Sequence, residues 1–365
     1  MKSYKLFYTI VLIAMLSIFT VSCGGNPPSG TSAENADNTG KAENVTINVY
    51  NWGDYIAEST ISNFEAKYPN IKVNYETFTT NEDMYVKIKT GGSNYDVAIP
   101  SDYMIKRMID EGMLNEINMQ NIPNYSLIGD RFKNLAYDPE NKYSVPYMWG
   151  TVGILYNKTM VNEPVDSWKI LWDKKYSKQI LMPDSERDSI GITLKMLGFS
   201  MNTKSLDELE AAKKALMEQK PIVLAYVVDE VKDKMIEGEA ALAVVWSGDA
   251  FYSIGENEDL EYAIPKEGTN LWFDAMVIPK TSKHQKEAET FINYMCETET
   301  AYQNADYIGY ASPHTEAVKK LDPELTSNRN AYPEPEDLKN SEIFEYPGDE
   351  LNKEYNRIWT EIKAN

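Results

Sequence analysis

Residues 46–77 read TINVYNWGDYIAESTISNFEAKYPNIKVNYET, and the alternation within this stretch decides the fold. The run Thr46–Tyr50 is rich in β-branched and apolar residues, which predicts a strand. Between Ile61 and Tyr68, large apolar residues recur at the spacing of one helix face. The run Lys72–Thr77 predicts a second strand. The stretch therefore has the strand, helix, strand order of a parallel sheet.

The same alternation continues along the rest of the chain. Further strands are predicted at Asp96–Ile99, Gly153–Tyr156, Gln179–Met182, Ala241–Trp246 and Ala275–Ile278. Helical patterns of apolar residues lie at Met84–Ile88, Ile105–Ile109, Ile190–Leu197, Leu206–Leu216 and Ala288–Met295. A length of 365 residues fits two domains of ordinary size. We therefore expect a two-domain α/β protein.

The N-terminus has the layout of a secretory signal. Lys2 and Lys5 precede sixteen uncharged, mostly apolar residues that end at Val21. This run is shorter than the roughly 20 residues that a membrane-spanning helix needs. Cys23 follows a small residue at the end of the run, an arrangement similar to a bacterial lipobox, in which the cysteine is acylated before cleavage. We therefore predict a signal peptide over residues 1–22 and a lipid on Cys23.

Residues 23–44 predict a flexible tether, because Gly, Ser, Asn, Thr, Ala and Pro dominate them. The tether would hold an extracytoplasmic body at the cell membrane, or in the periplasm. The second cysteine of the chain is Cys296, so a lipidated Cys23 would leave no intramolecular disulfide. We interpret Cys296 as a small buried apolar residue.

The charge and the histidine count exclude several functions. A formal net charge of −20 argues against nucleic acid as a partner and favours a cationic ligand. The two histidines, His284 and His314, argue against a histidine-centred catalytic or metal site. The sequence has no phosphate loop, dinucleotide fingerprint or nucleophile elbow. We expect a protein that is not an enzyme and needs no cofactor or metal.

An aromatic residue stands beside a carboxylate at the end of four strand signals: Tyr50–Tyr55, Ser101–Tyr103, Trp246–Asp249 and Trp272–Asp274. Ligands of open α/β sheets bind at the carboxyl ends of strands, so these four places could share one cleft. Carboxylates and aromatic faces fit an alkyl ammonium. A carboxylate ~4 Å from a cation attracts it by ~4 kcal/mol at an effective dielectric constant of 20, against ~0.5–2 kcal/mol for an aromatic face.

Each of these residues also has a structural interpretation. A single tryptophan can pack in the core, and Asp54 or Asp249 can cap a helix. We assign Asp102 as a helix N-cap, because it precedes a helical pattern. Trp168 and Trp172 lie in a lysine-rich, helix-like stretch, and we assign both to the structure.

Five motifs from Ile47 to the C-terminus carry a family resemblance: Val49–Trp52, Asp96–Ser101, Tyr143–Gly150, Trp272–Asp274 and Ile308–Tyr310. In order and spacing they are similar to those of the PotD/PotF family, the spermidine- and putrescine-binding components of ABC transporters. The resemblance implies the two-lobed type II periplasmic-binding-protein fold. Each lobe would be a mainly parallel sheet flanked by helices, with the ligand in the cleft between the lobes.

The resemblance also implies where the lobes divide. Lobe 1 would comprise residues 45–150 and 273–318, and lobe 2 residues 151–272 and 319–365. Closure of the lobes around the ligand would be read by the transporter permease. We expect a monomer that meets the membrane through its lipid.

Residue by residue, the resemblance implies a ligand framed by Trp52, Tyr55, Ser101, Tyr103, Trp246, Trp272 and Tyr310. Asp188 and Asp274 would be the amine partners, with Asp54 near the mouth of the cleft. Two departures concern the choice of ligand. Ser185 stands where spermidine binders have a second acid, and Asp249 resembles putrescine binders, whereas Trp272 is similar to the spermidine type. The pattern favours putrescine over spermidine.

Three alternatives remain open. The protein could bind another small solute, such as a sugar or an ion. It could be a glycan-active enzyme with a carboxylate pair, because aromatic rings and acids also line sugar sites. It could also serve a sensory receptor in place of a transporter.

Overall fold

The computed structural model of the protein describes residues 44–91 and 94–364. The predicted signal peptide, Cys23 and all but the last residue of the predicted tether lie outside the described residues. Among the residues that are described, no helix combines the length and apolar character needed to cross a membrane.

Nine strands of the described chain pair into one sheet, in the order β2-β1-β3-β9-β4-β7-β5-β6, with β8 paired to β4. Their bounds are β1 Val45–Trp52, β2 Ile71–Phe78, β3 Val97–Ala98, β4 Ser144–Asn157, β5 Ile180–Pro183, β6 Val223–Val227, β7 Leu242–Trp246, β8 Leu260–Ala263 and β9 Leu271–Val277. Seven of these strands overlap a predicted strand, although β4 begins nine residues before the predicted Gly153 and β9 four residues before the predicted Ala275. The strands β6 and β8 were not predicted.

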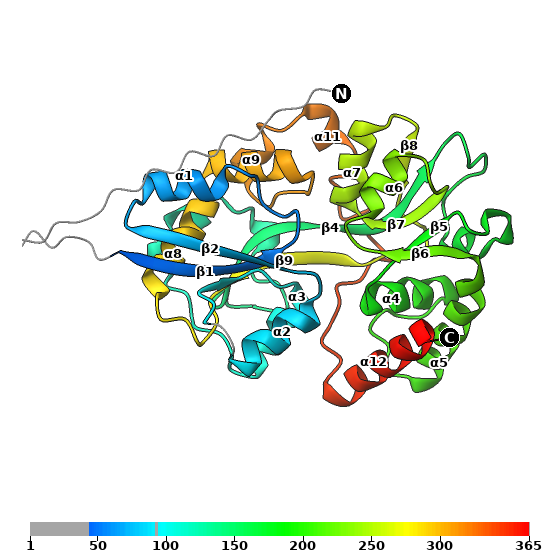
Figure 1. The fold of residues 1–365 in the computed structure, drawn as a ribbon, viewed down its shortest axis with the longest axis horizontal. Coiled ribbons are helices and arrows are strands. Elements are labelled where there is room, and N and C mark those ends of the chain that lie inside the picture. The colour runs from blue at the N-terminus through cyan, green and yellow to red at the C-terminus, as the bar shows by residue number, and fades with distance from the viewer. Residues whose placement is uncertain (1–43, 92–93, 365) are drawn as a thin grey trace, which may run out of the picture. The chain divides into compact units, whose positions relative to one another are not determined.

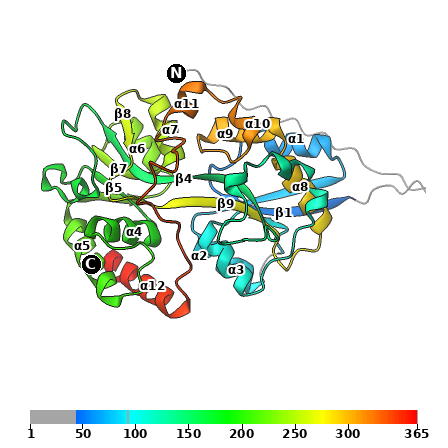
Figure 2. The same ribbon diagram turned by 180° about the vertical axis from the view of Figure 1, so that it is seen from behind.

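Helices cover both faces of this sheet. They are α1 Thr60–Lys67, α2 Asn81–Thr90, α3 Asp102–Asp110, α4 Glu186–Leu197, α5 Leu206–Gln219, α6 Val231–Ile236, α7 Ser247–Glu256, α8 Gln285–Met295, α9 Thr298–Ile308, α10 Thr315–Val318, α11 Pro323–Ser327 and α12 Asp349–Ala364. Helices α2, α3, α4 and α12 lie on one side of the sheet and α1, α6, α7 and α9 on the other (Figures 1 and 2).

Parallel strands form the two ends of the sheet, and antiparallel strands join them. β1 is parallel to β2 and β3, and β5 is parallel to β6 and β7. The long strand β4 pairs with β9 from Ser144 to Thr151 and with β7 from Val152 to Tyr156. The strand β4 thus changes its partner after Thr151, next to residue 150, where the chain is predicted to pass from lobe 1 to lobe 2. This is a mixed α/β fold, and the exact lobe boundaries remain a prediction.

Of the side chains interpreted as structural, Trp168 and Cys296 are buried and Trp172 is partly buried. Trp168 is fully buried and its indole N–H donates to the carbonyl of Gly268 at 2.8 Å, while Trp172 donates to the carbonyl of Ala215 at 2.8 Å. Cys296 is buried as expected, and burial raises the pKa of its thiol to about 12. A thiol with this pKa stays protonated at neutral pH and is a poor nucleophile.

Gly153 in β4 gives a test of the packing between β4 and β8. A Cβ atom at this position would lie 2.4 Å from the ring of Tyr262, which is buried and hydrogen-bonds to Thr151. We expect Gly153→Ala to lower the free energy of unfolding by about 1–3 kcal/mol, because the ring must shift in a packed core. Urea denaturation would measure this.

Gly255→Ala in α7 is the matched control, because a Cβ atom there meets open space. It should leave stability unchanged or raise it by up to about 1 kcal/mol, since alanine favours a helix. Equal stability of the two variants would show that the contact between Gly153 and Tyr262 does not limit the packing.

Candidate functional site

A cavity of about 330 Å³ lies between the two ends of the sheet, and residues of both predicted lobes line it. The structure brings all twelve of the predicted binding residues to its wall: Trp52, Asp54, Tyr55, Ser101, Tyr103, Ser185, Asp188, Trp246, Asp249, Trp272, Asp274 and Tyr310. Side chains at the carboxyl ends of β1 and β7 converge there, as the strand-end argument predicts. The prediction was wrong for Trp272 and Asp274, which lie near the start and in the middle of β9, because this strand begins at Leu271 and not after Asp274.

Asp274 lies on β9, and a β-bridge to Ser101 holds its backbone beside the start of α3. The hydroxyl of Tyr55 donates to Asp274 Oδ2 at 2.8 Å, while Asp274 Oδ1 is buried without a partner in the protein. Burial raises the pKa of Asp274 to about 7, and the nearby charge of Asp188 adds to the shift. One oxygen of this buried carboxylate is thus open toward a ligand.

Asp188 lies in the first turn of α4, which begins at Glu186 and not at Ile190 as predicted. Ser185 is the N-cap of this helix, and its hydroxyl donates to Asp188 Oδ2 at 2.8 Å. Asp188 Oδ1 is buried and has no partner in the protein. Burial raises the pKa of Asp188 to about 6, against the opposing hydrogen bond from Ser185. Ser185 therefore orients the acid and leaves its second oxygen open.

Asp249 differs from the other two acids, because a lysine ammonium lies within ion-pair distance of it. Burial raises its pKa to about 6, while Lys232 and a hydrogen bond from Tyr310 oppose the shift. The ammonium of Lys232 is 3.9 Å from Asp249 Oδ1 and donates to Asp54 Oδ2 at 2.9 Å. Asp54 stands in the turn after β1 with a left-handed φ of 45°, and its side chain is 67% exposed. It lies at the open edge of the cavity.

Aromatic rings form the walls between these acids. The rings of Trp272 and Tyr310 meet edge to face at 5.4 Å, and those of Tyr55 and Tyr310 at 5.3 Å. Glycines make room for them: a Cβ on Gly150 would lie 2.7 Å from the Trp272 ring, and one on Gly248 would lie 2.2 Å from the Tyr310 ring. The walls therefore offer ring faces suited to methylene groups and cations.

Asp102 corrects one sequence-based assignment. The N-cap of α3 is Ser101, and Asp102 is the first residue of the helix. The Asp102 carboxylate accepts the backbone N–H of Phe273 at 3.0 Å and that of Tyr103 at 2.6 Å. The assignment as an N-cap was wrong, because the buried acid ties α3 to β9. Asp102 thus positions the neighbouring Asp274.

Other described residues line the cavity without having been singled out from the sequence: Gly53, Phe78, Thr79, Thr80, Asn81, Glu82, Asp83, Asp184, Glu186, Arg187, Val228, Asp229, Lys232, Asn270, Phe344, Asn356 and Trp359. The strand-end rule could have found those that follow β2, β5 and β6. Phe344 and Trp359 come from the C-terminal segment, where no local pattern marks a ligand site.

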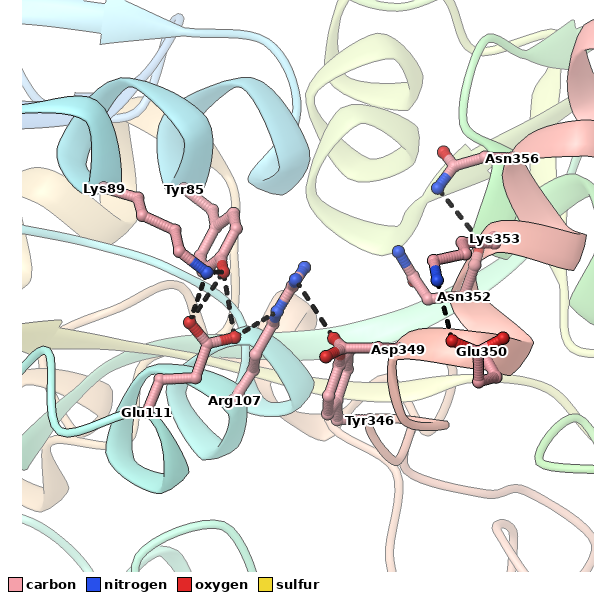
Figure 3. Close-up of polar contacts among 10 residues, drawn as sticks. All are labelled: Tyr85, Lys89, Arg107, Glu111, Tyr346, Asp349, Glu350, Asn352, Lys353 and Asn356. Carbon is pink, nitrogen blue, oxygen red and sulfur yellow. Dashed lines mark hydrogen bonds and ion pairs between the residues drawn. The ribbon is translucent and has the colours of Figure 1, made fainter.

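A polar contact outside the cavity wall joins elements of the two predicted lobes (Figure 3). The guanidinium of Arg107 in α3 lies 3.5 Å from Asp349 Oδ1 at the start of α12 and 4.8 Å from the ring centroid of Tyr346. On its own side, Arg107 contacts the ring of Tyr85 and donates to Glu111 at 3.0 Å. Arg107 is therefore held in place to meet α12.

Within the described ranges, no cluster of three or more His, Cys, Asp or Glu side chains could hold a metal ion. Two lobes around a cleft lined by buried carboxylates and aromatic rings define the class of two-lobed solute-binding proteins. The structure thus supports capture of a small cationic molecule.

Known proteins agree with this class. Residues 59–333 match the family described as bacterial extracellular solute-binding protein. The spermidine/putrescine-binding periplasmic protein of Escherichia coli (strain K12) is 36% identical over 315 residues, which cover 86% of this chain and 89% of the relative.

Two solved structures resemble the chain closely. One, from Listeria monocytogenes and assigned to a spermidine/putrescine ABC transporter, has a TM-score of 0.85 at 44% identity. The other, the spermidine/putrescine ABC transporter substrate-binding protein PotD from Streptococcus pneumoniae, has a TM-score of 0.75 at 42% identity. Each match covers 87% of this chain and 98% of the other. The chain belongs to the PotD family of solute-binding proteins, which are not enzymes.

Burial of Asp274 predicts an unusual dependence of stability on pH. Its pKa is about 7 in the folded protein and about 3.9 in an unfolded chain. The folded state therefore binds more protons between these values, and Asp274 lowers stability as pH rises from about 4 to 7. We expect Asp274→Asn to raise the free energy of unfolding at pH 8 by about 1–4 kcal/mol and to have little effect near pH 4.

Urea denaturation of ligand-free protein at both pH values would measure this difference. Asp138→Asn is the matched control, because that buried carboxylate accepts backbone N–H bonds from Lys142, Tyr143 and Ser144. The control should lower stability at pH 8. A similar loss in Asp274→Asn would show that Asp274 is stabilised by its surroundings and refute the argument.

Proposed function

We propose that this protein captures a polyamine, putrescine or spermidine, in the cleft and delivers it to the permease of an ABC transporter. One observation carries the proposal: Asp274 and Asp188 each keep a buried carboxylate oxygen without a partner in the protein. A buried charge without a partner is costly, and an ammonium group that donates hydrogen bonds offsets that cost. Two such acids within one cavity suit a ligand with two or more amines.

The character of the cavity supports a cation over a neutral sugar. A sugar can donate hydroxyl hydrogen bonds to Asp274 and Asp188, but it leaves their negative charges uncompensated in a buried site. The aromatic walls suit methylene chains as well as they suit sugar rings, so the acids decide between the two. The names of the relatives from Escherichia coli and Streptococcus pneumoniae also point to spermidine and putrescine.

Within the polyamines, we infer a preference for putrescine over spermidine. Ser185 stands where the resemblance places a second acid in spermidine binders, and its hydroxyl donates to Asp188. Three acids among the described lining residues have a buried oxygen without a partner: Asp188, Asp274 and Glu186. The resemblance names Asp188 and Asp274 as the amine partners, and these two match the two ammonium groups of a diamine. Trp272, with its indole N–H unpartnered, is the feature that still resembles spermidine binders.

We further infer that ligand binding favours closure of the lobes. Asp274 belongs to predicted lobe 1 and Asp188 to predicted lobe 2, so a ligand held by both acids joins the lobes. A ligand stabilises a conformation by its differential affinity for that conformation. The contact of Arg107 with Asp349 would add to the closed form. The permease would then recognise the closed protein.

Titration calorimetry with putrescine, spermidine, spermine and maltose tests the proposed function. We expect heat of binding with polyamines and none with maltose. Asp274→Asn should weaken polyamine binding about 100-fold or more, because a buried ammonium loses its charged partner, which contributes on the order of 3–5 kcal/mol.

Asp138→Asn is the control for this experiment, since that acid is buried outside the cavity wall. Its affinity should equal that of the wild type as long as the variant is folded. Binding of maltose with no binding of polyamines would refute the proposed function. Equal weakening by both substitutions would show that the site is misplaced.

We also propose that the mature protein is a monomeric, extracytoplasmic lipoprotein anchored through Cys23. The motif around Cys23 supports this anchor, and the lipid would keep the protein near its permease. A receptor-coupled sensory role would use the same cleft, and a transport assay in cells lacking the permease would distinguish the two roles.

Labelling of cells with a radioactive fatty acid tests the anchor. The wild type should carry label and partition with membranes, whereas Cys23→Ser should carry none, because it lacks the thiol that is acylated. Cys296→Ser should keep the label, since that thiol is buried in the folded body. Label in Cys23→Ser, or its loss in Cys296→Ser, would contradict the assignment.

A further inference from the structure

Lys232 in α6 is a cation of the protein itself that lies in the wall of the cleft. Its ammonium donates to Asp54 Oδ2 at 2.9 Å and lies 3.9 Å from Asp249 Oδ1. The Lys232 side chain is only 15% exposed, so its charge is largely withdrawn from water. A lysine in this setting is held by its acidic neighbours.

The carboxylates around Lys232 keep it charged. Burial lowers the pKa of Lys232, but Asp249, Asp54 and Asp229 together raise it above its ordinary value. Asp229 lies against the turn after β1, because a Cβ atom on Gly53 would be 2.9 Å from Asp229 Oδ2. This end of the cleft therefore holds three acids and one resident ammonium.

Arg187 is also a basic residue of the cleft wall, and its surroundings are different. Its guanidinium lies 4.6 Å from the ring centroid of Phe344 and 5.1 Å from that of Tyr103, and it donates to the carbonyl of Glu345 at 3.1 Å. Aromatic rings and a backbone carbonyl thus hold Arg187, whereas carboxylates hold Lys232.

The buried aspartates of the cleft fall into two groups as a result. Asp274 and Asp188 each have an open oxygen, and the charge of Asp188 raises the pKa of Asp274. Asp249 instead has the ammonium of Lys232 beside it and a hydrogen bond from Tyr310. A cation of the protein itself therefore compensates part of the charge of Asp249.

We propose that Lys232 acts as a tethered ammonium that fills the amine subsite at Asp249 and limits the ligand to two ammonium groups. The inference rests on the proposed function and names the residue that would set polyamine length. A diamine would occupy Asp274 and Asp188. A third ammonium, as in spermidine, would approach the acids at Asp249 and meet the charge of Lys232.

Substitution of Lys232 should therefore change selectivity and not only affinity. Lys232→Ala removes the charge and vacates the space, leaving Asp249, Asp54 and Asp229 for an ammonium of the ligand. We expect the ratio of spermidine to putrescine affinity to rise about tenfold or more, because a hydrogen bond to a charged group contributes on that order. Calorimetry with putrescine, spermidine and spermine would measure the ratio.

Two control variants separate this role from a general effect. Lys234→Ala removes a lysine of the same helix that pairs with Glu239 at 2.6 Å and lies outside the cavity wall, so it should keep the wild-type ratio. Lys232→Arg keeps the positive charge and should also keep the ratio low.

Thermal unfolding with n-propylammonium chloride gives a second readout that needs no polyamine. This ion replaces the part of the side chain that Lys232→Ala lacks. Relative to sodium chloride, it should raise the melting temperature of Lys232→Ala more than those of the wild type and Lys234→Ala. All three proteins keep the open oxygens of Asp274 and Asp188, but only Lys232→Ala has room for the ion at Asp249. The test also shows that the variant folds.

Several outcomes would overturn the inference. Equal loss of affinity for all three polyamines would make Lys232 a latch between the lobes through Asp54. An equal gain of affinity for all three polyamines would show that Lys232 only repels cations. If the ratio of spermidine to putrescine affinity is unchanged and n-propylammonium does not stabilise Lys232→Ala, Lys232 has no role in selection. If the wild type binds no polyamine, the proposed function falls, and the propylammonium test still decides whether the subsite at Asp249 exists.

Discussion

The antiparallel pairing of β9 with β3 and β4 is the constraint on which the cleft depends. β9 meets β3 at Val277 and pairs with β4 along most of its length, so it joins the two ends of the sheet. A β-bridge joins Ser101 to Asp274, and the backbone N–H of Phe273 donates a hydrogen bond to Asp102. These two contacts fix the position of Asp274. The other walls of the cleft are built around this strand.

The cleft keeps acids buried at the expense of stability. Burial raises the pKa of Asp188 and Asp249 to about 6 and that of Asp274 to about 7, so each acid binds a proton more readily in the folded protein than in an unfolded chain. Such strain is common at functional sites, where groups are arranged for a ligand and not for the folded chain alone. The ammonium groups of the proposed ligand would neutralise the carboxylate charges that are buried when the protein folds.

Charge acts at two distances in this protein. The formal net charge of −20 attracts cations from afar and speeds their encounter with the cleft. Inside the cleft, the selection that we propose depends on which acids the protein itself pairs. Arg187 packs against aromatic rings and Lys232 lies among carboxylates, so two basic residues of the cleft have different surroundings.

The sequence by itself determined seven of the nine described strands, six of the twelve described α-helices and part of the site. Periodicity located β1, α1 and β2 to within a few residues, and the strand-end rule grouped Trp52 with Trp246. Asp274 lies inside β9, and the structure brings it to the same cavity. Family resemblance was needed for Ser185 and Asp188. Only the tertiary structure decided the role of Lys232, which looks in sequence like any helix-surface lysine. Its partner Asp54 lies 178 residues away, and no local pattern encodes a contact between residues so far apart along the chain. Local periodicity reflects forces between neighbours, whereas a charge pair across a cleft exists only once the sheet has brought the two lobes together.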